Sequence, residues 1–132
     1  MNKTTNNTTK QKPWILVVED DVFINRAYSA KFLHDGIETK MAEDGEQALE
    51  ILKGADKPRL ILLDLMLPKK SGFEVLKEIK QDQRLKDIPV LILTNLAQVD
   101  DATQGAALGA KEYLVKADLK IEDLVKKVKQ YL

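Results

Sequence analysis

The sequence has no cysteine, and only one histidine and one tryptophan among its 132 residues. Without cysteine it can hold no disulfide framework, no zinc–thiolate site and no thiol nucleophile. The single histidine, His34, closes a predicted helix, where we expect it to interact with the helix dipole rather than take part in chemistry. No apolar run reaches the roughly 18 residues that a membrane-spanning helix needs, and the N-terminus has no apolar segment typical of a secretory signal.

No charge of one sign is in excess either. The chain has 21 Lys and Arg residues and 21 Asp and Glu residues, so its formal net charge is zero. This balance argues against a general nucleic-acid-binding surface, which would carry an excess of basic residues. We interpret the lysine clusters at 69–70 and 126–129 as solvated faces. The sequence therefore predicts a cytoplasmic protein with no direct contact to nucleic acid or membrane.

The chain divides into a polar leader and one domain. Residues 1–13 are rich in Asn, Thr and Lys and predict a disordered leader. Residues 14–132 have a length typical of one domain, and a hydrophobic content of 44% allows a full core. The leader looks more like a natural N-terminus than a linker, which favours a stand-alone protein over a fragment that has lost an output domain.

Strand and helix patterns alternate along the domain. Apolar or alternating segments predict strands at 14–18, 37–42, 60–64, 90–94 and 111–115. Helical spacing and capping residues predict helices at 22–34 (capped by Asp21), 46–53, 71–81 (capped by Ser71), from Asp100 or Asp101 to Leu108, and over Ile121 to Val128. This alternation is typical of an α/β fold with a doubly wound, five-stranded parallel sheet and helices on both faces. We expect the flavodoxin-like strand order 2-1-3-4-5.

Charged and hydroxyl side chains follow the predicted strands. Glu19 and Asp20 come after the first strand and Asp64 after the third, while Thr94 ends the fourth and Lys116 follows the fifth. In the expected strand order these residues project from one edge of the sheet. Three neighbouring carboxylates repel each other unless a cation lies among them. Their oxygens suit Mg²⁺ (or Mn²⁺) better than a closed calcium cage.

Four motifs together resemble the receiver domains of two-component response regulators. They are Val17-Val18-Glu19-Asp20-Asp21, Leu63-Asp64 with Pro68 and Gly72, Leu93-Thr94, and Tyr113-Leu114-Val115-Lys116. The resemblance covers residues 14–132 and implies that Asp64 is the phosphoacceptor for a sensor histidine kinase or phosphotransfer protein. It also implies that the domain catalyses only its own phosphorylation and dephosphorylation, and controls an unidentified downstream protein.

The same resemblance implies roles for the other site residues. Asp20, Asp64 and the backbone carbonyl of Met66 would bind Mg²⁺ directly, and Glu19 would bind it through water. Thr94 and Lys116 would stabilise the phosphoryl group, and Thr94 and Tyr113 would form a switch pair. The responding surface would be the fourth helix, fifth strand and fifth helix, through which two copies can also form a homodimer.

Three features depart from the family's usual pattern. Ala117 follows Lys116 where the family usually has proline after a cis peptide, so we expect either a trans bond with a re-routed loop or a strained cis bond. Asn95 stands where a small residue is common, and would narrow access to Asp64 or add an amide donor. Met66 and Leu96 are apolar at positions that influence an attacking water, which predicts a long-lived acyl phosphate.

Other functions remain open from the residues alone. A Mg²⁺-dependent aspartyl phosphohydrolase would need an acid/base Asp two residues beyond Asp64, where Met66 stands. A pseudo-receiver that binds partners without phosphorylation is opposed by the complete set of site residues but favoured by Ala117. A flavin-binding reading lacks a phosphate-cradling first loop, because Glu19 and its acidic neighbours would repel phosphate.

Overall fold

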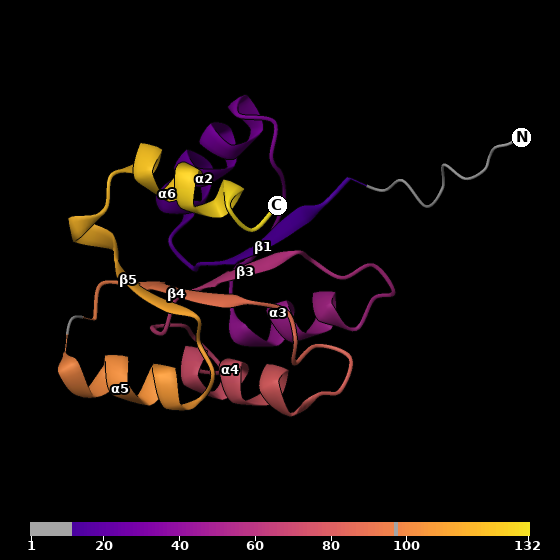
Figure 1. Ribbon diagram of the computed structural model, residues 1–132, viewed down its shortest axis with the longest axis vertical. Helices are drawn as coiled ribbons and strands as arrows, with labels where there is room; N and C mark the ends of the chain where they lie inside the picture. Colours follow the sequence, from indigo (N-terminus) through magenta and orange to yellow (C-terminus); the bar gives the residue numbers. More distant parts are fainter. Residues whose placement is uncertain (1–11, 97) are drawn as a thin grey trace, which may run out of the picture.

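The computed structural model describes residues 12–96 and 98–132. All but the last two residues of the predicted leader therefore lie outside the described part of the chain. Strands and helices alternate along the described part (Figure 1) in the order β1 (Trp14–Val18), α2 (Val22–His34), β2 (Glu38–Ala42), α3 (Gly45–Leu52), β3 (Leu60–Leu63), α4 (Gly72–Gln81), β4 (Val90–Thr94), α5 (Val99–Ala107), β5 (Glu112–Val115) and α6 (Ile121–Lys129). A short 3-10 turn, η1 (Lys116–Asp118), connects β5 to α6. No helix in these two ranges is long and apolar enough to cross a membrane.

The five strands form one parallel sheet in the order β2-β1-β3-β4-β5. Helices α2 and α6 cover one face and α3, α4 and α5 cover the other (Figure 1). Each face has its own apolar core, one built around Phe32 and Leu124 and the other around Leu76 and Ile79. The predicted doubly wound fold and strand order are confirmed.

Burial along the strands follows their position in the sheet. Strands β1, β3 and β4 are buried at every residue, since each has a strand on both sides and helices on both faces. Strand β2 alternates exposed and partly buried residues up to Ala42, and β5 is partly buried throughout. These two edge strands are the ones that leave main-chain groups unpaired within the described sheet.

Helices α2 and α4 begin with the expected capping residues. The Asp21 side chain accepts hydrogen bonds from the backbone N–H groups of Phe23 and Ile24 at 2.9 and 3.1 Å. Ser71 forms a capping box with Glu74 at the start of α4. These bonds satisfy N–H groups that the first helical turn leaves without partners.

The start of α5 differs from the prediction. The helix begins at Val99, with Gln98 at the N-cap and no side-chain capping bond, so neither Asp100 nor Asp101 is the cap. Both acids lie in the first turn instead, where a carboxylate interacts favourably with the helix dipole. A cap and a first-turn acid have the same residue types, which is why the sequence pattern misplaced the cap by two or three residues.

The chain after β5 takes the first of the two expected routes. No peptide bond in the described ranges is cis, so the Lys116–Ala117 bond is trans. The backbone turns directly into η1, and the Leu119 N–H donates to the Lys116 carbonyl at 3.3 Å. This turn directs the Lys116 side chain back towards the carboxyl edge of the sheet.

Gly72 allows the loop after Asp64 to close tightly. Its N–H donates to the Leu65 carbonyl at 3.0 Å. A Cβ at this position would lie 2.3 Å from the Asp64 carbonyl oxygen and 2.6 Å from the Leu65 Cα. Both are backbone atoms, which cannot move aside as a flexible side chain can. A side chain at position 72 would therefore displace the backbone of Asp64.

We expect Gly72→Ala to lower the free energy of unfolding by about 1–3 kcal/mol, the usual cost of overpacking a close contact. Urea unfolding monitored by far-UV circular dichroism measures this. Gly54→Ala is the matched control, because a Cβ there would be 3.4 Å from the Ile51 carbonyl oxygen, an ordinary contact. Equal unfolding midpoints for the two variants would contradict the steric account.

Candidate functional site

The strand order brings five predicted site residues to one edge of the sheet. Glu19 and Asp20 follow β1, and Asp64 follows β3, which lies beside β1. Thr94 is the last residue of β4 and Lys116 the first after β5. Parallel strands all end at this edge, so residues far apart in the sequence meet there.

Asp64 is buried, and its carboxylate accepts three hydrogen bonds. Only 6% of the residue is exposed. Its Oδ1 accepts the Met66 N–H at 3.1 Å and the Thr94 hydroxyl at 2.7 Å, and its Oδ2 accepts the Lys116 ammonium at 2.7 Å. The carboxylate is therefore held in one orientation by a backbone donor, a hydroxyl and a cation.

Lys116 joins the carboxylates of the first and third strands. Its ammonium donates both to Asp64 and to Glu19. The Lys116 side chain is 10% exposed, and the Glu19 residue is 3% exposed. The opposite charges thus meet away from bulk water, where their attraction is strongest and where an unpaired charge would be most costly.

The first loop is fixed by two further contacts of Glu19. Its Oε2 accepts the Asp21 N–H at 2.9 Å, and its backbone carbonyl accepts the Asn25 amide at 2.7 Å. Asn25 is buried on α2 and was not predicted as a site residue. The only sequence signal for it is an amide side chain on a helix face that lies against the loop.

The pKa shifts reflect this balance of burial and pairing. Burial raises the pKa of Glu19, although the Lys116 ammonium and the Asp21 N–H act in the opposite direction. Burial alone would lower the pKa of Lys116, but the hydrogen bonds to Asp64 and Glu19 outweigh it and leave that pKa raised. Lys116 is therefore firmly cationic, and it is the counter-ion of the acidic group within the described part of the protein.

Three carboxylates could share one metal ion. Ligand atoms of Glu19, Asp20 and Asp64 all lie within 4.8 Å of one another. Asp20 is exposed while the other two are buried, so the cluster opens to solvent on the Asp20 side. An all-oxygen donor set with one open side fits a hard divalent cation that retains water, such as Mg²⁺ or Mn²⁺.

Within the described part of the chain, the two predicted switch residues, Thr94 and Tyr113, bond to different partners and not to each other. Thr94 is fully buried against Asp64. Tyr113 is partly buried, and its hydroxyl donates to the Leu96 carbonyl at 2.6 Å, two residues beyond Thr94. Gly105 on α5 lies against this region, since a Cβ there would be 3.7 Å from the Tyr113 ring.

The remaining predicted positions lie at the mouth of the site. Met66 is 57% exposed. Asn95 is exposed and lines a cavity of about 330 Å³ together with Lys116, Ala117 and α2 residues that include Tyr28. Asn95 thus lies at a cavity that it shares with Lys116, and among the described residues its amide makes no hydrogen bond to Asp64.

Comparisons with known proteins agree with the fold. Residues 15–129 match the model of the response regulator receiver domain. The chain is 40% identical over 122 residues to the DNA-binding dual master transcriptional regulator RpaA of Synechocystis, covering 91% of this chain and 49% of that protein. It is 39% identical over 129 residues to the "probable methanogenesis regulatory protein FilR2" of Methanothrix harundinacea, covering 89% of this chain and 81% of that protein.

A solved structure shows the same likeness. The Mn²⁺-bound form of response regulator Rcp1 is 38% identical, with a TM-score of 0.77, and the match covers 90% of this chain and 91% of that chain. The chain spans about half the length of RpaA. The family match over most of the domain, with the fold and the acidic cluster, shows that this chain belongs to the response regulator receiver domains of two-component signalling.

Proposed function

We propose that the chain accepts a phosphoryl group on Asp64 from the phosphohistidine of a sensor kinase or phosphotransfer protein. The observation that carries this proposal is the carboxylate of Asp64 itself, fixed beside two acidic residues and held by Lys116 and Thr94. An Asp64 oxygen forms a bond to phosphorus while the bond from phosphorus to the histidine nitrogen breaks. The product is an acyl phosphate on Asp64 and a free histidine on the donor.

The acidic cluster supplies the cation site that this transfer needs. Asp20, Asp64 and the Met66 backbone carbonyl would hold Mg²⁺ directly, and Glu19 would hold it through water. When bound, the ion neutralises negative charge on the phosphoryl oxygens. The burial of the three carboxylates supports this arrangement. Glu19 and Asp64 are buried and Asp20 is exposed, so the cluster is open at Asp20 to water and phosphate oxygens.

Lys116 and Thr94 then act on the transferred group. The Lys116 ammonium, which now bridges Asp64 and Glu19, is close enough to move to a phosphoryl oxygen. The Thr94 hydroxyl, which now donates to Asp64, would donate to a second phosphoryl oxygen. Both donors are in place before the reaction, so little reorganisation is required.

Movement of Thr94 gives the signal a route to the surface. Its departure from Asp64 leaves space into which the Tyr113 ring can rotate, with loss of the bond from Tyr113 to the Leu96 carbonyl. Tyr113 belongs to β5, so the change reaches the surface formed by α5, β5 and α6. That surface would control a downstream protein, and in relatives such as RpaA the regulator also binds DNA.

Acetyl phosphate with Mg²⁺ should add one phosphoryl group to the protein, detected by intact-mass spectrometry. Asp64→Asn should abolish the addition because the nucleophilic oxygen is replaced by an amide. Asp82→Asn, which changes a carboxylate at the end of α4, is the matched control and should be labelled normally. Unchanged labelling of Asp64→Asn would refute the proposal, and repeated turnover of a small phosphate ester would favour a phosphohydrolase.

We expect the acyl phosphate to be long-lived, because Met66 and Leu96 offer no polar side chain to orient an attacking water. Phosphate release from labelled protein in Mg²⁺-containing buffer measures its lifetime. Met66→Asn should shorten the lifetime several-fold, whereas Val99→Asn, at an equally apolar exposed position on α5, should not. A half-life of seconds in the unmodified protein would be the contrary result.

A further inference from the structure

Strand β2 has an open edge. In the described sheet it pairs only with β1, with Thr39 beside Ile15 in the register. The Ala42 carbonyl accepts the Glu19 N–H at 2.9 Å, so it points towards β1. The backbone N–H and C=O groups of successive residues alternate in direction along a strand. Those of Lys40 therefore also point towards β1, while those of Thr39 and Met41 point away from it, to the open edge. Such an edge is a template for another strand unless something blocks it.

The residues of this edge are complementary to themselves. The order Ile37-Glu38-Thr39-Lys40-Met41 reads apolar, acidic, hydroxyl, basic, apolar, and in the reverse direction the acidic and basic positions exchange places. If two copies pair antiparallel about a two-fold axis at Thr39, each Glu38 lies opposite Lys40 of the second copy. Opposite charges in this position stabilise a strand pair, and like charges destabilise it.

The geometry also selects one register. With the axis at Thr39, the outward N–H and C=O groups of the two Thr39 residues form a hydrogen-bonded pair. Shifting the axis to Lys40 would place two ammonium groups opposite each other. Glu38 is exposed, and the Lys40 ammonium lies 4.3 Å from the centre of the Trp14 ring; neither side chain forms an ion pair with another described residue.

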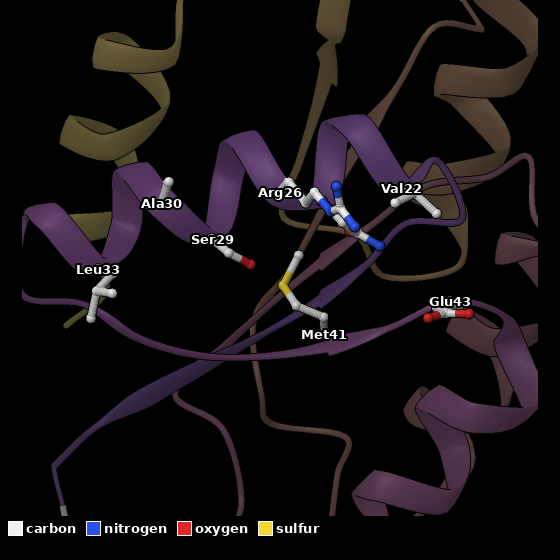
Figure 2. Close-up of a pocket in the computed structure, with 8 residues that line it drawn as sticks. Val22, Arg26, Ser29, Ala30, Leu33, Met41 and Glu43 are labelled. Atoms are coloured by element: carbon white, nitrogen blue, oxygen red, sulfur yellow. The ribbon is translucent and has the colours of Figure 1, made fainter.

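A groove beside the same edge extends the surface onto α2. It has a volume of about 560 Å³ and lies between α2 and β2 (Figure 2). Arg26 and Met41 point into the space between helix and strand in this view. Val22 and Leu33, at the two ends of the α2 stripe that lines the groove, are 50% and 77% exposed. Between these apolar ends the stripe carries the polar residues Asn25, Arg26 and Ser29, so the surface beside the open strand combines exposed apolar side chains with polar ones, as the rim of an interface does.

We propose that this surface, the β2 edge with the α2 stripe, binds a second copy of the chain. The two-fold axis at Thr39 joins the two sheets into one continuous sheet and sets the two α2 helices antiparallel on the same face. Leu33 of each copy then becomes buried. Because the formal net charge is zero, two copies of the chain do not repel each other through their overall charge. Since β5 lies at the other edge of the sheet, this dimer forms independently of phosphorylation.

Charge reversal tests the proposed register by sedimentation velocity on the full chain. Glu38→Lys and Lys40→Glu should each place like charges opposite each other and shift the protein from dimer to monomer. The double variant Glu38→Lys/Lys40→Glu should dimerise again, because both pairs become complementary. An equimolar mixture of the two single variants should form a heterodimer. Lys77→Glu, an exposed change on α4, is the control and should leave the dimer intact.

Three results would overturn the proposal. The first is an unmodified protein that is monomeric at every concentration tested. The second is a dimer that persists in both single variants or fails to return in the double variant and the mixture. The third is a dimer that forms only with beryllofluoride, which would indicate the α5, β5 and α6 surface instead. Circular dichroism of each variant verifies that the fold is retained.

A cysteine placed on the axis gives an independent test, since the chain has none of its own. Antiparallel hydrogen-bonded pairs have Cα atoms about 5.5 Å apart, within disulfide range. Thr39→Cys should therefore form a covalent dimer on mild oxidation, while Thr103→Cys, exposed on α5, should not. Equal cross-linking of the two variants would contradict the proposed axis.

Discussion

The site depends on one buried ammonium between two buried carboxylates. Lys116 pairs with Glu19 and Asp64 where all three side chains are at most 10% exposed. Carboxylates this close would repel one another and lose hydration without a cation, so the acidic group needs its counter-ion to exist in the folded state. The positions are 97 and 52 residues apart in the sequence, so only the completed sheet can bring them together.

That constraint explains why several supporting residues are tightly fitted. The Asn25 amide holds the Glu19 carbonyl, the Met66 N–H holds Asp64, and Gly72 lets the loop behind Asp64 close against its backbone. In the proposed mechanism the same lysine serves two states. It neutralises the carboxylates of Glu19 and Asp64 in the unphosphorylated protein, and it would donate to a phosphoryl oxygen during the transfer.

The sequence predicted those features that depend on continuous patterns. The apolar runs of β1, β3 and β4 identify buried parallel strands, and charges at strand ends identify the carboxyl edge. Two kinds of feature could not be predicted from the sequence: contacts set by close packing, and positions where neighbouring residues of the same type could fill one role. The acids at 100 and 101 fit a cap and a first turn equally well. The pairing of Lys116 with Glu19, the bond from Asn25 and the closeness of Gly72 to Asp64 all require the three-dimensional fold.

Lys116 and a divalent cation would compete for the same carboxylates, those of Glu19 and Asp64. Isothermal titration of Mg²⁺ into the protein and into Lys116→Met tests this most directly. We predict that Lys116→Met binds Mg²⁺ several-fold more tightly, because the competing ammonium is gone while Glu19, Asp20 and Asp64 remain. Unchanged or weaker Mg²⁺ binding by Lys116→Met would contradict the account.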